Sequence, residues 1–250
     1  MNAAARAAAL LLSLACAAGH AADYVGVGGG ALDSALPVNG ASIKVRPFLM
    51  RATPVSREEF RTFLRQDPAW SKERVPRLFA GAGYLRNLTD SAGDTPVTEV
   101  SWFAARAFCA AENARLPTWY EWEFAAAADA TRIDARKDPV WLARILRWYE
   151  RPAKDTPAPV AMDANVWGVR GLHGNIYEWV DDFNGLFVTA DSRSQGEQKT
   201  LETCGAAALS LADRDNYAIL MRIALLSALS ATDTLGTLGF RCAKTREEAK

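Results

Sequence analysis

The segment from Arg115 to Ala126, RLPTWYEWEFAA, constrains the fold more strongly than any other part of the chain. Thr118 precedes Glu121 by three residues, the spacing of a capping box, in which each side chain satisfies a backbone amide at a helix start. Pro117 ends whatever element precedes it. The pattern therefore predicts an aromatic-rich helix over residues 119–128.

Local signals predict two further helices, over residues 56–66 and 139–149. Ser56 and Glu59 form a second capping box, and apolar residues then recur at helical spacing. Pro139 follows an aspartate, which is typical of a helix start, and a wide apolar face comes after it.

Residues 67–94 mix proline, glycine and charged residues without a period. This composition predicts a long irregular connection, and such loops often build binding surfaces. The apolar residues expected to pack it onto the core are Trp70, Leu78, Phe79 and Tyr84.

The amino terminus has the features of a secretory signal peptide over residues 1–21. Arg6 precedes an apolar stretch from Ala7 to Ala18, which is shorter than the roughly 20 residues that cross a bilayer. Cys16 offers an alternative, a lipoprotein acylated at that thiol. Ser13 stands where a lipoprotein signal usually has leucine or valine, which favours plain cleavage and a periplasmic or secreted protein.

Residues 22–250 are enough for one substantial core, so we expect a single domain. The whole sequence has 29 basic and 29 acidic residues. This balance gives no electrostatic basis for binding a polyanion, so nucleic acid is not an expected partner.

Five segments, in this order along the chain, resemble the signature of the formylglycine-generating enzymes, also called sulfatase-modifying factors. The resemblance implies an α+β fold, the formylglycine-generating-enzyme type of C-type-lectin-like fold, with much irregular structure and a helix over residues 102–113. It also favours a strand near residues 222–225, inside an apolar run whose periodicity alone fits a buried helix or a buried strand. The segments are 24–30 (YVGVGGG), 96–102 (PVTEVSW), 115–126, 171–179 (GLHGNIYEW) and 238–243 (LGFRCA).

The resemblance implies that two cysteines of the family's "WxCxxxYC" stretch hold a copper ion, for which soft thiolates are suited. The corresponding residues 205–218 contain no cysteine. Counting back from the "GFRC" word places Asp213 and Ala218 at the thiol positions, whereas matching the glycine turn places Ser210 at the first. We therefore expect neither copper nor formylglycine-generating oxidase activity.

Three cysteines remain after the signal peptide. The resemblance implies a disulfide between Cys109 and Cys242, which an oxidising compartment would allow. A second family disulfide would use the positions of Ala126 and Ile223, where two apolar side chains are expected to fill the volume. Cys204 is left over, and it is either a reactive thiol or a small buried hydrophobe.

The 171–179 segment resembles a family calcium site, with candidate ligands Asn175, Ile176 and Glu178, because carboxylate, amide and carbonyl oxygens suit a hard cation. The alternative is that Asn175 shapes a turn while Glu178 pairs with a core arginine. His173 is the one histidine after the signal peptide, which excludes a multi-histidine metal site and favours a structural role.

Three arginines lie in otherwise apolar segments of the sequence and need a carboxylate partner if they are buried. They are Arg115, Arg222 and Arg241. The candidate carboxylates are Glu121, Glu123, Glu178, Asp181 and Asp182.

The words LPTWYEWE and EWVDDFN resemble the branch of nitrite-reductase accessory proteins. This resemblance implies an accessory factor with a protein partner in the periplasm, either a metalloenzyme or its maturation machinery. One alternative is an oxidase whose centre is rebuilt around Cys204. The other is a lectin-like module that binds a ligand.

Overall fold

The computed structural model describes residues 23–36, 41–88, 93–149, 163–186 and 217–246. It combines short strands with short helices, so the α+β prediction is confirmed. The strands are β1 (Tyr24–Val27), β2 (Gly30–Leu32), β3 (Ile43–Val45), β4 (Phe48–Arg51), β5 (Tyr177–Glu178), β6 (Leu238–Gly239) and β7 (Ala243–Thr245). The helices are α1 (Arg57–Gln66), α2 (Trp102–Ala111), α3 (Trp119–Ala126), α4 (Pro139–Tyr149) and α6 (Tyr217–Ser227), with 3₁₀ turns η1 (Pro68–Trp70) and η2 (Phe183–Gly185).

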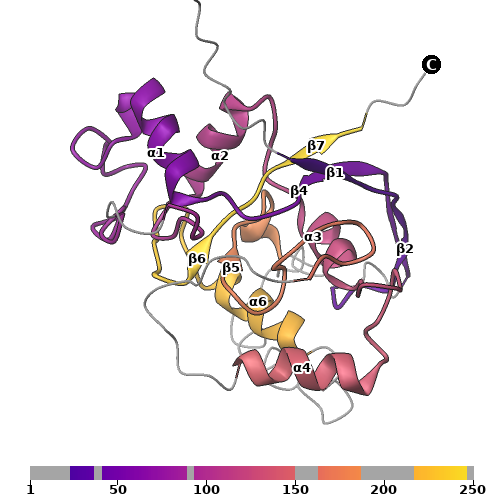
Figure 1. Ribbon diagram of the computed structural model, residues 1–250. Coiled ribbons are helices and arrows are strands. Elements are labelled where there is room, and N and C mark those ends of the chain that lie inside the picture. Colours follow the sequence, from indigo (N-terminus) through magenta and orange to yellow (C-terminus); the bar gives the residue numbers. More distant parts are fainter. Residues whose placement is uncertain (1–22, 37–40, 89–92, 150–162, 187–216, 247–250) are drawn as a thin grey trace, which may run out of the picture.

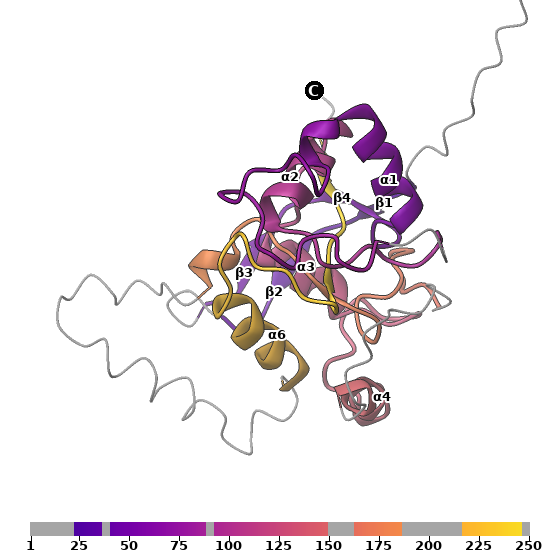
Figure 2. The same cartoon turned by 90° about the vertical axis from the view of Figure 1, so that its left-hand side faces the viewer.

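The main sheet joins the two ends of the described chain. Its strand order is β1-β4-β7, with both pairs antiparallel, and Tyr24 pairs with Arg51 while Phe48 pairs with Thr245. A separate antiparallel pair is formed by β2 and β3, and β5 lies parallel to β6. In both views the main sheet and α1 lie at one end of the molecule, while α4 lies at the opposite edge beside α6 (Figures 1 and 2).

Two glycines are required by close backbone approach. A Cβ at Gly239 would lie 2.2 Å from the Val97 carbonyl oxygen, and a Cβ at Gly29, whose φ is +69°, would lie 2.6 Å from that of Val45. Glycine avoids both contacts and the cost of positive φ. Steric contacts therefore explain why glycine occupies positions 239 and 29 in this chain.

The predicted helices 56–66, 102–113, 119–128 and 139–149 are confirmed as α1 to α4, within two residues at each end. Both capping boxes are formed. At α4, the Asp138 carboxylate accepts from the amide of Val140 at 2.8 Å. The capping residues therefore predicted the starts of α1, α3 and α4 correctly.

The prediction of a strand near residues 222–225 is wrong, because these residues lie inside α6. Ile219, Ile223 and Leu226 are all buried, and their spacing of four and three residues places them on one helical face. The run is also rich in alanine, leucine and methionine, which favour helix.

The expected packing of the 67–94 connection is partly wrong. Tyr84 is buried, and its hydroxyl donates to the Trp70 carbonyl oxygen at 2.9 Å. Leu78, however, is 73% exposed. The expected anchor therefore lies on the surface, where it contributes little to the core.

The disulfide between Cys109 and Cys242 is confirmed, and it links the end of α2 to the residue before β7. It lies beside an aromatic cluster in which the rings of Phe108 and Phe240 are 5.4 Å apart. Ala126 and Ile223, at the positions of the second family disulfide, are both buried apolar residues.

No helix in the described part of the chain is long and apolar enough to cross a membrane.

Replacing both Cys109 and Cys242 by alanine should lower the free energy of unfolding by about 2–5 kcal/mol, because the bridge constrains the unfolded chain. Urea unfolding measures this loss. A reductant should weaken the wild-type protein to the same level and leave the variant unchanged. Non-reducing peptide mapping that found Cys204 joined to Cys242 would contradict this pairing.

Candidate functional site

The centre of the molecule is held by a buried ion pair between Arg241 and Glu178. The Arg241 Nε and Nη2 donate to the two carboxylate oxygens of Glu178, each at 2.8 Å, and both side chains are fully buried. The Trp122 indole donates to the same carboxylate at 2.9 Å. The prediction that Arg241 pairs with one of the candidate carboxylates is therefore confirmed.

Arg222 donates to backbone carbonyl oxygens of the 171–178 segment. Its Nη2 donates to the carbonyl oxygens of Leu172 at 2.8 Å and Ile176 at 3.1 Å. Its guanidinium lies 4.5 Å from the centroid of Trp122 and 5.1 Å from that of Tyr177. This arginine therefore shapes the 171–178 segment.

Of the two roles left open for Glu178, the structure contains the ion pair with an arginine. The Ile176 carbonyl, the second candidate calcium ligand, also accepts from an arginine, and Asn175 lies in the preceding turn. A calcium ion at these three residues would have to compete with both arginines. The calcium site stays a prediction.

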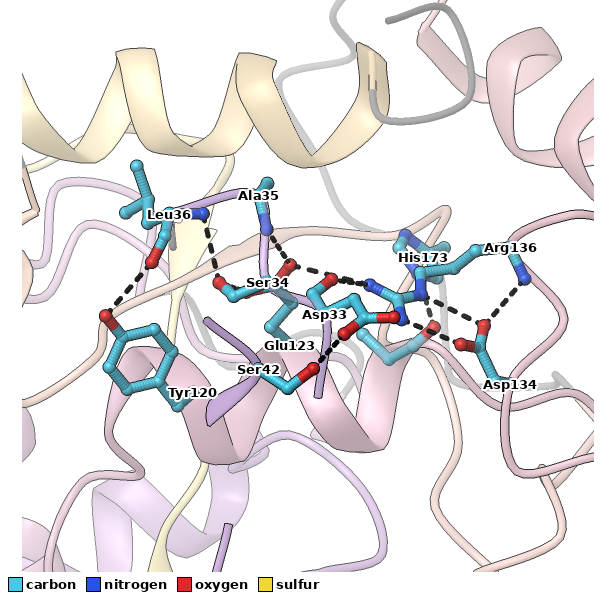
Figure 3. Close-up of polar contacts among 11 residues, drawn as sticks. Asp33, Ser34, Ala35, Leu36, Ser42, Tyr120, Glu123, Asp134, Arg136 and His173 are labelled. Atoms are coloured by element: carbon cyan, nitrogen blue, oxygen red, sulfur yellow. Dashed lines mark hydrogen bonds and ion pairs between the residues drawn. The ribbon is translucent and has the colours of Figure 1, made fainter. Parts of the chain in front are cut away.

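Arg115 and Glu121 form the second predicted pair, with Nη to carboxylate distances of 2.6 and 2.7 Å. Glu123 is fully buried and accepts from the Ser34 hydroxyl at 2.5 Å and the Ala35 amide at 2.8 Å (Figure 3). Burial raises the pKa of the Glu123 carboxyl. Glu123 thus fastens the segment after β2 to α3.

The positions that the resemblance assigns to the copper thiols fall only partly within the described residues. Ser210, Asp213 and Cys204 lie outside them. Ala218 lies in the first turn of α6, where it is buried in a small apolar cluster with Ala135, Trp141 and Ile145. The side chain of Ala218, a methyl group packed against α4, cannot act as a metal ligand.

A cleft of about 380 Å³ opens beside this cluster, between the end of α3, helix α4 and residues 163–174. Trp141 and Ile145 of α4 form part of its apolar wall. Arg144, Asp163 and His173 supply polar groups. The cleft combines an apolar wall with several polar groups, which makes it the candidate binding site.

His173 is held in the cleft wall by its ring contacts. Its Nε2 lies 2.9 Å from the Ala126 carbonyl oxygen, and its ring makes edge contacts with Trp122 and Trp141. Burial, with a smaller contribution from the positive charges of Arg222 and Arg144, lowers the pKa of His173 to about 3. The imidazole is therefore neutral at physiological pH.

Sequence reasoning assigned His173 a structural role and did not select Arg144 or Asp163. No local signal could have found them, because α4 and the 163–174 segment meet only through tertiary packing. Among the described residues, no group of three or more histidines, cysteines, aspartates or glutamates could hold a metal.

Replacing Glu178 by glutamine should lower the free energy of unfolding by about 3–5 kcal/mol, because it leaves the buried Arg241 without its counter-charge. Urea unfolding with and without calcium measures the loss and shows whether the wild-type protein responds to the ion. Glu58→Gln, which alters two ion pairs of an exposed carboxylate on α1, with Arg61 and Arg65, should change little and is the matched control. Equal losses in the two variants would contradict the central role of the pair.

The low pKa of His173 predicts a loss of stability as pH falls from about 6.5 to about 3. In that range the unfolded chain binds a proton at this histidine and the folded protein does not, so the loss reaches up to about 1.4 kcal/mol per pH unit. His173→Gln keeps a donor for the Ala126 carbonyl and removes the titration. The difference between the two unfolding profiles isolates this histidine; parallel profiles would contradict its burial in the neutral form.

Comparison with known proteins assigns the family. The Sulfatase-modifying factor enzyme 1-like domain matches residues 15–246. An inactive C-alpha-formylglycine-generating enzyme 2 from Mus musculus is 25% identical over 83% of this chain and 78% of its own length. A formylglycine-generating enzyme from Streptomyces coelicolor is 32% identical over 59% of this chain and 52% of its own length. A hercynine oxygenase from Mycobacterium tuberculosis is 29% identical over 55% of this chain and 38% of its own length. Because the domain match spans nearly the whole sequence, the chain belongs to the sulfatase-modifying factor family.

Proposed function

We propose that this chain is a non-oxidase member of its family that assists the maturation or assembly of a periplasmic metalloenzyme, as nitrite-reductase accessory proteins do. The number of cysteines is the observation that supports the first part of the proposal, the lack of oxidase activity. The sequence has four cysteines, and the bridge consumes Cys109 and Cys242. Once a signal peptide with Cys16 is removed, Cys204 alone remains, and one thiol cannot form a two-thiolate copper centre.

The names of the relatives support a role other than oxidation of a sulfatase. One similar protein is named an inactive formylglycine-generating enzyme, and another is named a hercynine oxygenase. Family membership is therefore compatible with loss or replacement of the parent activity.

A surface near α2 supports the second half of the proposal, a protein partner. Leu78 is 73% exposed and precedes Phe79, whose ring is half-buried like those of Trp102 and Phe103, and Arg106 stacks 4.8 Å over Trp102. The ring of Phe103 lies 5.2 Å from Phe79 and 5.4 Å from Trp102. Aromatic residues and arginine are enriched at protein interfaces.

The accessory role can be tested in cells that lack this chain. The metal content and activity of periplasmic nitrite reductase should fall, and the wild-type chain and Cys204→Ser should both restore them. Leu78→Asp should fail to restore them, whereas Ile133→Asp, at another exposed apolar residue, should succeed. Unchanged metal content in the cells lacking the chain would contradict the proposal.

Calcium at Asn175, Ile176 and Glu178 belongs to the same proposal as a structural ion. Its support is the resemblance of the 171–179 segment and the oxygen ligands there. A melting temperature that rises with calcium in the wild-type protein but not in Glu178→Gln would support it, since ligands that bind only the folded state stabilise it.

The purified chain should not convert a cysteine in a sulfatase peptide to formylglycine. Preloaded with copper and incubated under oxygen, it should cause no mass change from thiol to aldehyde, because the soft ligand pair is missing. The Streptomyces coelicolor formylglycine-generating enzyme is the positive control. Turnover by this chain that vanished in Cys204→Ser would contradict the proposal and favour an oxidase rebuilt around Cys204.

A further inference from the structure

The tautomer of His173 follows from its hydrogen bond. A carbonyl oxygen only accepts, so the Nε2 that lies 2.9 Å from the Ala126 oxygen carries the ring proton. Because the imidazole is neutral, its Nδ1 is a bare acceptor. This atom is buried and has no hydrogen-bond partner among the described residues. Buried acceptors are nearly always satisfied, so a water molecule or a ligand in the cleft is expected to donate to this atom.

Two opposite charges line the same cleft. Arg144 projects from α4, Asp163 begins the 163–174 segment, and both residues are exposed. Neither takes part in an ion pair within the described residues, whereas the nearby Asp129 and Asp138 are both bound by Arg132. The cleft therefore presents one available cation and one available anion.

We propose that this cleft binds a small zwitterion of the amino-acid type. The ligand's ammonium group donates to Nδ1 of His173 and faces Asp163, and its carboxylate accepts from Arg144. Trp141, Ile145 and Val169 provide apolar wall for a ligand side chain. The cleft volume, about 380 Å³, is at the lower end of the range for small-molecule sites, about 300–1,000 Å³.

Other ligand classes fit these groups less well. An inorganic anion would face the lone pair of Nδ1 and the charge of Asp163. A sugar hydroxyl could donate to Nδ1, but it would leave both charges without partners. A metal ion would find a single histidine, and the described residues contain no metal-binding group of three.

This inference concerns a small ligand, and it stands whether or not the chain assists a metalloenzyme. Binding can be measured on the purified full chain, whereas the accessory role is measured in cells. If one test fails, the result of the other can therefore still be interpreted.

Isothermal titration calorimetry with matched probes tests the proposal. L-leucine should bind more tightly than 4-methylpentanoate, which lacks the ammonium group, and than isoamylamine, which lacks the carboxylate. Each difference should be at least about tenfold, because each analogue loses a charge-assisted hydrogen bond. The dipeptide leucylglycine shows whether the site takes a free amino acid or the amino terminus of a peptide, and either result keeps the zwitterion chemistry.

Two exposed substitutions assign the charges without disturbing the core. Arg144→Gln should remove the preference for leucine over isoamylamine. Asp163→Asn should reduce the preference over 4-methylpentanoate, because the hydrogen bond to Nδ1 of His173 remains. Arg147→Gln, which lies on α4 but lines a different groove, should change neither preference. Equal affinities for the three leucine probes, preferences that are unchanged in both variants, or no binding of any common amino acid would overturn the proposal.

Discussion

The buried pair of Arg241 and Glu178 is the interaction on which the rest of the structure depends. Besides Glu178, the guanidinium donates to the carbonyl oxygens of Arg51, Ala52 and Arg170, at 3.2, 3.3 and 2.8 Å. A single side chain thus joins the end of β4, the 163–174 segment and β5 to the connection between β6 and β7. An unpaired charge at this depth would cost several kcal/mol, so all these segments must be placed together for the fold to be stable.

This dependence follows from the shortness of the strands, since β5 and β6 contain two residues each and contribute few ladder hydrogen bonds. Side chains take over the task of satisfying buried backbone groups. Glu123 holds the amide of Ala35, and Arg136 donates to the carbonyl oxygen of Asp33 at 2.6 Å (Figure 3). The irregular segments are therefore fixed by polar side chains from α3 and from the connection before α4.

Sequence could predict what depends on local chemistry. The starts of α1, α3 and α4 follow from capping residues, and the family resemblance implied the disulfide. The apolar surroundings of Arg241 in the sequence predicted that it needs a carboxylate partner, without deciding which one. The α6 run was misassigned because an almost uniformly apolar segment carries no period, so only its packing decides between helix and strand. The exposure of Leu78 and the meeting of Arg144 with His173 depend on tertiary contacts between segments far apart in sequence, which local patterns do not encode.

Helix α4 connects the position of Ala218 with the wall of the cleft. Its inner face, through Trp141 and Ile145, covers Ala218, the position that the resemblance assigns to the second thiol. The same two residues line the cleft, and Arg144 between them supplies its cation. A thiolate at position 218 would lie in an apolar cluster, where an unpaired charge is costly to bury. The side chains of α4 therefore both cover the position that the resemblance assigns to the second thiol and form part of the cleft wall, so a change in packing at residue 218 would also change the shape of the cleft.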